Sequence, residues 1–502
     1  MKLSLCMIVR DNEETLVPCL ESIKPWVDEM IIVDTGSVDR TMDIVKEFGG
    51  KLFEFPWCDD FSAARNVSLD HASGEWLFWM DSDDTITAEC GQRLRELADS
   101  NHDPRIMGYV MQVHCPGGSE SGMEEHTVVD HVKMFRNRED LRFEGRIHEQ
   151  VLMPIRRLGG EIAATDIYVV HSGSDRSEES QKAKVERDMR ILKKDLEERP
   201  DHPFVLFNFA MTYAESHEYE KAIEWCKKCL EHSTPNESHV PKTYAYLANC
   251  LLQLERAEES LEVCKNARQL YPNDAELLFR EAMSFQAIDN HSEAISCYKQ
   301  ILDLETPESL RSTDPGITGF KCRFNLGVAY RDAKMDLHAE RQWRQVLDEC
   351  PSYIPAQLAL TEILIANRRL QTSRVLAKRW QESEESRLIG LLLEAQVTEL
   401  DGETSEANRL YKKCIDLAPD DSTILEKCCR FYFENDPAIA AELLERLIAC
   451  DSGNAAAYHN LGSIRLQQNQ REQAIDLLRK SLNLRPDYHP TLSLLAIAES
   501  EA

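Results

Sequence analysis

Short apolar runs alternate with amphipathic stretches over the first 110 residues. Apolar runs of strand length occupy residues 3–9, 30–33, 51–55 and 76–80. Apolar residues at helical spacing occupy the intervening residues 12–23, 37–48 and 63–72. Strands that alternate with helices predict a mainly parallel sheet with helices on both faces. The N-terminal part is therefore predicted to be a Rossmann-like α/β domain.

A more irregular group of apolar runs follows, and then a highly charged stretch. We expect further strands of the same domain at residues 108–114, 128–135, 151–154 and 167–171. In residues 176–200, apolar residues recur at helical spacing among charged ones, which predicts a helix. The sequence thus predicts an α/β domain over residues 1–175 and a helical connector over 176–200.

Residues 201–502 repeat a helical pattern with a period of about 34 residues. Most units carry a small residue where two helices would cross: Ala222, Ser260, Ala294, Ala339, Ala407, Ala440 and Ala474. The unit at 356–380 diverges, with Arg374 at that position, and residues 306–319 interrupt the array. The pattern resembles the tetratricopeptide repeat. This resemblance implies an all-α solenoid of about eight repeats, closed by a final helix at 490–502.

Composition and charge narrow the classes of partner. The chain has a formal net charge of −30, whereas a nucleic-acid-binding surface needs clustered Lys and Arg. We therefore expect no nucleic-acid partner. No stretch approaches the roughly 18 apolar residues of a membrane-spanning helix, so we expect no integral membrane segment. Many of the 16 cysteines, such as Cys226 and Cys229, fall at core positions of the repeat, which indicates reduced thiols and a cytoplasmic protein.

Polar residues stand at the ends of three strands that are predicted to be parallel. Asn12, Asp34 and Asp81 each lie at or just beyond the carboxyl end of a strand. In open α/β sheets these ends meet along one edge, and ligands bind there. The topology alone therefore predicts a ligand site at these three positions.

Four motifs in this domain point to one family. They are VRDNEE at residues 9–14, DTGSVDRT at 34–41, DDFSAARN at 59–66 and WMDSDD at 79–84. In this order, and each near the end of its own strand, they resemble glycosyltransferase family 2, in particular bacterial members fused to tetratricopeptide repeats. The resemblance covers residues 1–175 and implies the GT-A fold.

The resemblance implies a nucleotide-sugar donor, and the residue types fit this donor. The two phosphates of such a donor need a hard cation, which prefers carboxylate oxygens. Asp81 and Asp83 are two apart in a segment expected to be extended, so they would point the same way. We expect Asp83 to bind Mn²⁺ or Mg²⁺, and Asp81 to bind the metal or the ribose. His171, which ends the last strand, either completes the metal shell or is satisfied by a backbone carbonyl.

Further residues are expected to contact the donor. A carboxylate at Asp34 can accept a hydrogen bond from the ring N–H of uracil, and Arg65 can pair with phosphate bidentately. A UDP-sugar is therefore the expected donor. The other contacts implied by the motifs are Arg10, Asn12, Glu13, Ser37, Asn66 and Ser82.

The acceptor side has a weaker signature. The run FEGRIHE at residues 143–149 resembles the His-Glu element of the fused members. An inverting transferase, which the family resemblance implies, needs a base that deprotonates the acceptor. Glu149 is the candidate base, with His148 beside it. The alternative is a structural ion pair of Glu149 with Arg146 or Arg142.

The sequence thus predicts a metal-dependent glycosyltransferase of the hexosyltransferase type. Its repeats would recruit a protein or peptide acceptor, or a second copy of the chain in a homodimer. A first alternative is a scaffold whose transferase domain has lost activity, although Asp34, Arg65, Asp81 and Asp83 are all present. A second alternative is a transferase that acts on a cell-surface glycan or a lipid-linked acceptor.

Overall fold

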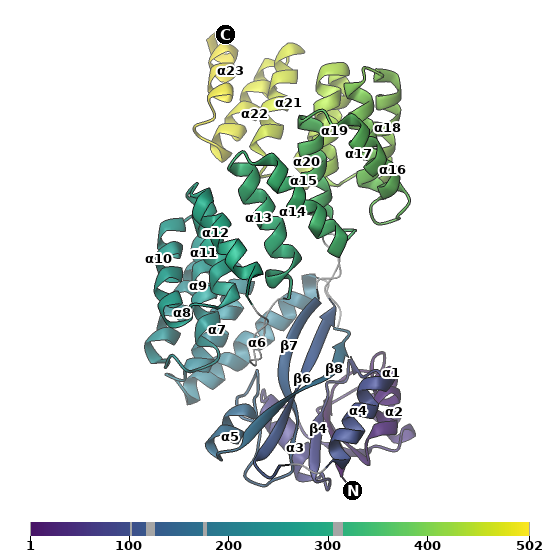
Figure 1. Cartoon of the computed structure of the whole chain (residues 1–502), viewed down its shortest axis with the longest axis vertical. Helices are drawn as coiled ribbons and strands as arrows, with labels where there is room; N and C mark the ends of the chain where they lie inside the picture. The colour runs from purple at the N-terminus through teal and green to yellow at the C-terminus, as the bar shows by residue number, and fades with distance from the viewer. Residues whose placement is uncertain (1, 101–102, 117–125, 174–177, 305–314, 501–502) are drawn as a thin grey trace. The chain divides into compact units, whose positions relative to one another are not determined.

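A computed structural model of the chain describes residues 2–100, 103–116, 126–173, 178–304 and 315–500. The chain forms two compact units that divide between Cys350 and Pro351. The first unit holds an eight-stranded sheet, its covering helices and the first part of a helical array (Figure 1). The second unit is helical throughout the residues that the structure describes.

The sheet is mixed, with one parallel half. Its strand order is β3-β2-β1-β4-β7-β6-β8-β5. The pairs among β1 to β4 are parallel, β7 runs antiparallel to β4 and β6, and β8 is parallel to β6 but antiparallel to β5. The strands are β1 Leu3–Val9, β2 Glu29–Asp34, β3 Lys51–Glu54, β4 Trp76–Trp79, β5 Asp84–Thr85, β6 Ile106–Pro116, β7 His126–Arg136 and β8 Glu161–His171.

Helices cover both faces of the sheet, because the central strands are apolar on both faces. In β4, Trp76 and Phe78 pack into one core cluster, while Leu77 and Trp79 pack into another. Alternate residues of a strand point to opposite faces, so a strand buried on both sides reads as a continuous apolar run. Helices α1, α2 and α4 contribute to the first cluster, and α3 and α5 to the second (Figure 1). The helices of this domain are α1 Leu16–Ile23, η1 Lys24–Trp26, α2 Thr41–Glu47, α3 Phe61–Asp70, α4 Ala88–Asp99 and α5 Leu152–Arg157.

Two local predictions were wrong. Residues 151–154 belong to helix α5 rather than to a strand. A run of four apolar residues cannot distinguish the two structures by periodicity. The helix expected from residue 37 begins at Thr41, because the hydroxyl of Ser37 accepts a hydrogen bond from the backbone N–H of Asp11 across the site.

A long helix, α6 (Glu178–Glu198), joins the sheet domain to a helical array. In the described residues this array has sixteen helices that form eight consecutive pairs, followed by α23 (His489–Ser500). A short 3₁₀ turn, η2 (Pro315–Thr318), precedes the fourth pair, and residues 305–314 of the expected interruption lie outside the described residues. The pairs are α7 Pro203–Glu215 and α8 Tyr219–His232, α9 Val240–Gln253 and α10 Ala257–Leu270, α11 Ala275–Ala287 and α12 His291–Leu302, α13 Phe320–Asp332 and α14 Asp336–Glu349, α15 Ile354–Ala366 and α16 Leu370–Gln381, α17 Arg387–Leu400 and α18 Thr404–Leu417, α19 Ser422–Asn435 and α20 Pro437–Cys450, and α21 Ala455–Gln467 and α22 Arg471–Leu484.

The small residues of the repeat lie at a single position, the fourth residue of each second helix. All of them, from Ala222 to Ala474, are fully buried. In the divergent unit this position belongs to Ser373, which is also fully buried, and Arg374 next to it is exposed. Placing Arg374 there was therefore an error of one residue, and the unit keeps the small residue that lets its two helices approach.

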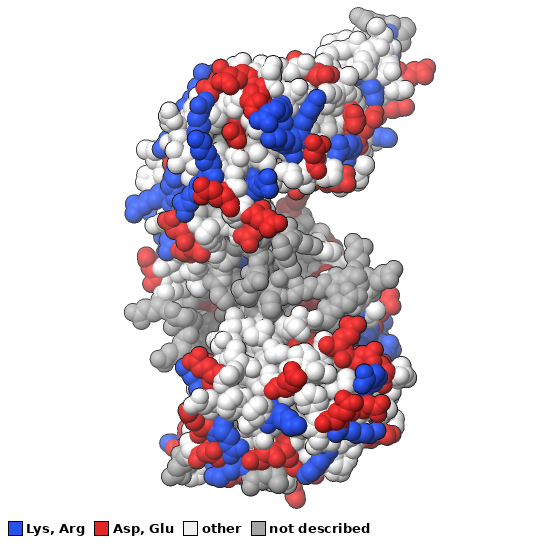
Figure 2. All heavy atoms as spheres, turned by 90° about the vertical axis from the view of Figure 1, so that its right-hand side faces the viewer, with Lys and Arg blue, Asp and Glu red and all other residues white. Residues whose placement is uncertain are grey.

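The surface is charged but mixed in sign. On the face shown in Figure 2, Asp and Glu side chains alternate with Lys and Arg side chains over both units. Such interspersed charges are typical of a solvated surface. Within the described residues, every helix is too short or too polar to cross a membrane.

Candidate active site

The loops after β1 and β2 form one hydrogen-bonded edge. The carboxylate of Asp34, at the end of β2, is buried and accepts hydrogen bonds from the backbone N–H groups of Gly36 (2.9 Å) and Ser37 (3.0 Å). Asp34 therefore shapes its own loop, and Gly36 provides the positive φ of 113° that the turn requires.

The other motif residues of this edge tie the two loops together. Asn12 accepts from the backbone N–H of Arg10 (2.9 Å), and its own N–H donates to the hydroxyl of Thr41 (2.7 Å). The carboxylate of Glu13 accepts from the backbone N–H of Arg40 (3.1 Å). Arg10 is exposed, with its guanidinium 3.9 Å from Asp11. Asn12, Asp34 and Asp81, which were expected to converge, stand at or after the ends of β1, β2 and β4. These three strands are neighbours in the sheet, in the order β2-β1-β4.

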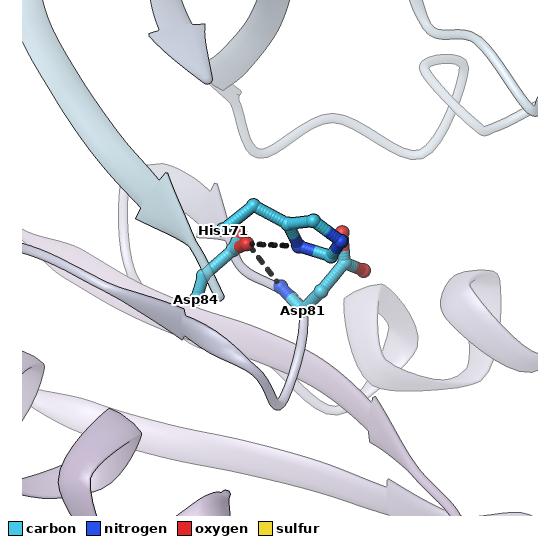
Figure 3. A group of neighbouring side chains, drawn as sticks. All are labelled: Asp81, Asp84 and His171. Atoms are coloured by element: carbon cyan, nitrogen blue, oxygen red, sulfur yellow. Dashed lines mark hydrogen bonds and ion pairs between the residues drawn. The ribbon is translucent and has the colours of Figure 1, made fainter. Parts of the chain in front are cut away.

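The acidic motif after β4 is a turn rather than the expected extended segment. The backbone N–H of Asp84 donates to the carbonyl of Asp81 (3.0 Å), so the carboxylates of these two residues lie closer together than extended geometry allows. Ser82 is buried within the turn. Strand β5 then pairs Asp84 with His171 at the end of β8, which brings the histidine to the turn (Figure 3).

His171 is oriented by the carboxylates around it. Its Nδ1 lies 2.9 Å from Asp84 Oδ1 and 3.4 Å from Asp83 Oδ1. The hydrogen bond with Asp84, together with the three nearby carboxylates, raises the pKa of His171 against the effect of burial. An ionised carboxylate can only accept, so Nδ1 donates to Asp84, and Nε2 is the ring nitrogen left for a metal.

A buried lysine neutralises Asp84. Lys133 of β7 is 1% exposed and donates from Nζ to Asp84 Oδ2 (2.9 Å), which also accepts from the backbone N–H of Asp81. Burial opposes ionisation of Asp84, but Lys133 and His171 outweigh it, and the pKa of this carboxyl is lowered. Both oxygens of Asp84 are thus engaged by protein groups.

The residues present fit a divalent cation. Ligand atoms of Asp81, Asp84 and His171 all lie within 4.8 Å of one another. Because both oxygens of Asp84 are engaged, the carboxylate available beside them is that of Asp83, whose Oδ1 lies 3.4 Å from His171 Nδ1. Burial raises the pKa of Asp83, and the carboxylates of Asp81 and Asp84 raise it further, against the effect of His171. A carboxyl group destabilised in this way by its neighbours gains from a cation beside it.

Arg65 of α3 links this turn to the acceptor-side segment. Its Nη2 donates to Asp81 Oδ1 (2.6 Å), and its Nε donates to Glu149 Oε1. Cζ of its guanidinium lies 4.4 Å from the centre of the Trp79 ring. Nζ of Lys133 lies 3.8 Å from the centre of the same ring. Arg65 Nη1 is buried and has no hydrogen-bond partner within the described part of the chain. Burial opposes ionisation of Asp81, but Arg65 outweighs it and holds the pKa of Asp81 well below its usual range.

Glu149 and His148 lie on a short hairpin whose ends, Glu144 and Gln150, exchange two backbone hydrogen bonds of 3.0 Å. His148 is exposed and adopts a left-handed conformation (φ 54°). The alternative partners proposed for Glu149 are bound elsewhere. Arg146 pairs with Glu198 and Arg142 with Asp70, whereas Glu149 pairs with Arg65.

Asn66 contacts this segment as well. Its side chain accepts from the backbone N–H of Phe143 (2.9 Å) and donates to the carbonyl of the same residue (3.1 Å). Asn66 thus fastens helix α3 to the segment that leads into the hairpin.

Sequence reasoning missed Lys133, Trp79 and the role of Asp84. One signal was present, since a lysine within an otherwise apolar strand must be paired if that strand is buried. The identity of its partner was not visible, because Asp84 is 49 residues away.

Comparisons with known proteins match two families within the chain. The model of glycosyl transferase family 2 matches residues 4–154, and a tetratricopeptide repeat model matches residues 205–232 and 455–488. A TPR repeat-containing protein of Synechococcus elongatus is 32% identical over 267 residues, which are 52% of this chain and 63% of that protein. The glycosyltransferase SunS of Bacillus subtilis is 27% identical over 254 residues, 49% of this chain and 58% of that protein.

The chain therefore spans about three fifths of each of these two relatives. The match to a solved tetratricopeptide repeat protein from Parabacteroides merdae covers 59% of this chain and 98% of that protein, at 16% sequence identity. Its TM-score of 0.39 is too low to support an argument. The N-terminal part of this chain is a glycosyltransferase family 2 domain, and tetratricopeptide repeats follow it.

Proposed function

We propose that the chain is a metal-dependent glycosyltransferase that moves one hexosyl group from a UDP-sugar to a protein or peptide acceptor, with inversion. One observation carries the proposal. The Arg65 guanidinium bridges Asp81, in the acidic turn, and Glu149, on the acceptor-side hairpin. The guanidinium of Arg65 thereby holds a donor-side and an acceptor-side carboxylate on either side of it, at the carboxyl edge of the parallel strands.

On the donor side, the linked loops after β1 and β2 receive the nucleoside. Asp34 fixes its loop through Gly36 and Ser37, and the proposal gives it the ring N–H of uracil as a further partner. Arg10, which is exposed at this edge, is free to turn toward the donor. The unpartnered Nη1 of Arg65 gives this residue one remaining donor for a phosphate oxygen.

Asp81, Asp83 and His171 Nε2 are the proposed ligands of a divalent cation, Mn²⁺ or Mg²⁺. Asp84 is assigned to orient His171, because Lys133, the Asp81 N–H and His171 Nδ1 already occupy its oxygens. When bound, the cation supplies Lewis-acid stabilisation of the diphosphate leaving group.

Glu149 is the proposed base. Arg65 binds its Oε1, which leaves Oε2 to accept the proton of the acceptor. The side chain of Glu149 is 11% exposed, so little water competes for this oxygen. His148 precedes it in the hairpin and is exposed.

The repeats are the proposed docking surface for the acceptor polypeptide or for a second copy of the chain, since stacked repeats present an extended concave surface. Reduced cysteines, most of them buried, are consistent with a cytoplasmic setting. The name of the Bacillus subtilis relative, a glycosyltransferase, supports the activity but not the acceptor.

The proposal is tested by incubating the full chain with Mn²⁺ and a panel of UDP-sugars and measuring UDP release. We expect turnover with at least one donor and a loss of 100-fold or more in Asp83→Asn, roughly the size expected for removing a key electrostatic group. Asp420→Asn, at an exposed carboxylate of the repeats, is the matched control. Absence of release with every donor would instead favour the scaffold.

A further inference from the structure

We propose that helix α6 is a positioning element of the transferase site. Its residues Asp195 and Glu198 hold Arg146, and through Arg146 they hold the hairpin that carries Glu149. This inference rests on the proposed function in one respect, the role of Glu149 as the base. The contacts themselves are independent of that role.

The hairpin needs external support. Two backbone hydrogen bonds close its ends, but its interior contains two residues with positive φ, Gly145 (99°) and His148 (54°). A non-glycine residue in the left-handed region is strained, and it persists only when surrounding contacts fix it. The conformation next to Glu149 therefore depends on what packs around the hairpin.

Helix α6 provides one side of this support. The carboxylate of Asp195 is buried and accepts from the backbone N–H of Arg146 (3.3 Å). The guanidinium of Arg146 donates from Nε to Glu198 (3.1 Å). Ile147, the next residue, packs into a core cluster with Ile191 and Leu192 of α6 and with two residues of α7, Val205 and Phe209.

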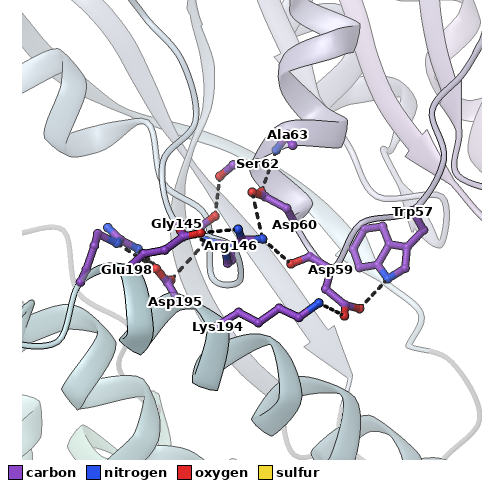
Figure 4. A network of polar contacts seen from close by, with 11 residues as sticks. Trp57, Asp59, Asp60, Ser62, Ala63, Gly145, Arg146, Lys194, Asp195 and Glu198 are labelled. Carbon is purple, nitrogen blue, oxygen red and sulfur yellow. Dashed lines mark hydrogen bonds and ion pairs between the residues drawn. The ribbon is translucent and has the colours of Figure 1, made fainter.

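Helix α3 and the turn before it provide the other side. The backbone N–H of Phe61 donates to the carbonyl of Arg146 (2.8 Å), and the hydroxyl of Ser62 donates to the carbonyl of Gly145. Arg146 also donates from Nη1 to the carbonyl of Asp59 (3.3 Å). Arg146 thus lies between α6 and α3 and contacts both (Figure 4).

The turn before α3 is itself bound to α6. Asp59 has a positive φ of 58°, and its carboxylate accepts from Lys194 (2.7 Å) of α6 and from Trp57 Nε1 (3.0 Å) (Figure 4). Arg190 of α6 donates to the same carboxylate (3.0 Å). Helix α6 therefore holds two turns, and each contains a residue in the left-handed conformation.

These two turns lead to the two partners of the site's bridging ion pair. Arg65 lies on α3 six residues after Asp59, and Glu149 lies three residues after Arg146. A change in α6 thus alters the relative placement of Arg65 and Glu149, whereas the loops after β1 and β2 are held by hydrogen bonds within and between themselves. The expected effect is on the chemical step rather than on nucleotide binding.

The test uses the full-length double variant Asp195→Asn/Glu198→Gln, with Glu197→Gln as the matched control on an exposed neighbour of the same helix. We expect hydrogen exchange of peptide 143–150 to accelerate about tenfold, while a peptide over β4 is unchanged. For the UDP-sugar with the highest wild-type turnover, we expect kcat of UDP release to fall at least tenfold with KM within twofold. The affinity for UDP with Mn²⁺, measured by calorimetry, should not change.

Unchanged exchange of peptide 143–150 in the double variant would overturn the proposal. Faster exchange with an unchanged kcat would overturn it as well, because the hairpin would then not govern the reaction. The single variant Glu198→Gln guards against misfolding, since this side chain is 56% exposed. If the wild-type chain released no nucleotide, the proposed function would fail. The exchange measurement would still show whether α6 holds the hairpin of residues 144–150.

Discussion

At the scale of single residues, Glu29 shows how a buried charge can start a strand. Its carboxylate accepts hydrogen bonds from the Ser4 hydroxyl (2.6 Å), the Ser73 backbone N–H (2.6 Å) and Lys51 Nζ (2.7 Å). Burial acts to raise the pKa of Glu29, but these bonds outweigh it and lower the pKa from 4.5 to about 2. Glu29 thereby joins β1, β2, β3 and the segment before β4.

The lowered pKa gives a prediction about acid stability. A group whose folded-state pKa lies below its unfolded value stabilises the fold above the unfolded pKa, and that stability is lost as pH falls through the folded pKa. Glu29→Gln should therefore reduce the free energy of unfolding by about 2 kcal/mol at pH 7, with a smaller reduction at pH 3.5. Melting temperatures at the two pH values measure this. The exposed Glu54→Gln of β3 is the control, and an equal loss at both pH values would contradict the argument.

Lys133 gives a second prediction at this scale. Removing one partner of a buried ion pair leaves the other charge without compensation, at a cost of about 3–5 kcal/mol. Lys133→Met should destabilise the chain by this amount, since Asp84 is fully buried. The double variant Lys133→Met/Asp84→Asn should be more stable than Lys133→Met alone in thermal denaturation. If the double variant lost as much stability as Lys133→Met and Asp84→Asn lose separately in sum, the broken ion pair would not be the cause of the loss in Lys133→Met.

At the scale of secondary structure, close approach of helices depends on residues without long side chains. A Cβ added at Gly327 of α13 would lie 2.3 Å from Nε1 of Trp343, which is fully buried and donates to the carbonyl of Phe324 (3.1 Å). The equivalent addition at Gly462 of α21 meets Cγ and Cδ2 of the buried Leu478 at 3.0 Å, so a displacement of a few tenths of an ångström relieves the contact.

The two glycines should therefore respond differently to alanine. Gly327→Ala should lower the free energy of unfolding by about 1–3 kcal/mol, because the tryptophan cannot move without losing its hydrogen bond. Gly462→Ala should be near neutral, because a helix gain of about 1 kcal/mol offsets the small displacement of Leu478. Thermal melts of both variants, followed by circular dichroism, provide the comparison. Equal losses would refute the proposed difference.

The sequence predicted elements better than it predicted contacts between them. Apolar periodicity located the strands and the repeats, because each period reports which side of an element is buried. It failed at residues 151–154, where the apolar run is too short, and at Arg374, where the small residue is its neighbour Ser373. The candidate site was located by strand ends, but the pairing of Arg65 with Glu149, 84 residues apart, depends on tertiary structure alone.

At the scale of the whole molecule, the boundary expected after residue 175 lies inside one compact unit. The sheet domain, α6 and the first four helix pairs belong to one compact unit that ends at Cys350. Trp57 and Phe61 of the sheet domain share a core cluster with Ile191 of α6 and Phe209 of α7. A domain defined by sequence resemblance therefore ends before the residues that complete its core.

This continuity predicts how shortened chains behave. A chain of residues 1–350 should fold and release UDP with a kcat within about threefold of the full chain, because it retains the compact unit with α6 and the hairpin together. A chain of residues 1–175 should lose at least tenfold in kcat, because Arg146 loses Asp195 and Glu198 and Ile147 loses its apolar partners. UDP release and hydrogen exchange of residues 143–150, measured on both chains, decide between the outcomes. Full activity of the 1–175 chain would show that the family 2 domain is self-sufficient and that α6 only connects it to the repeats.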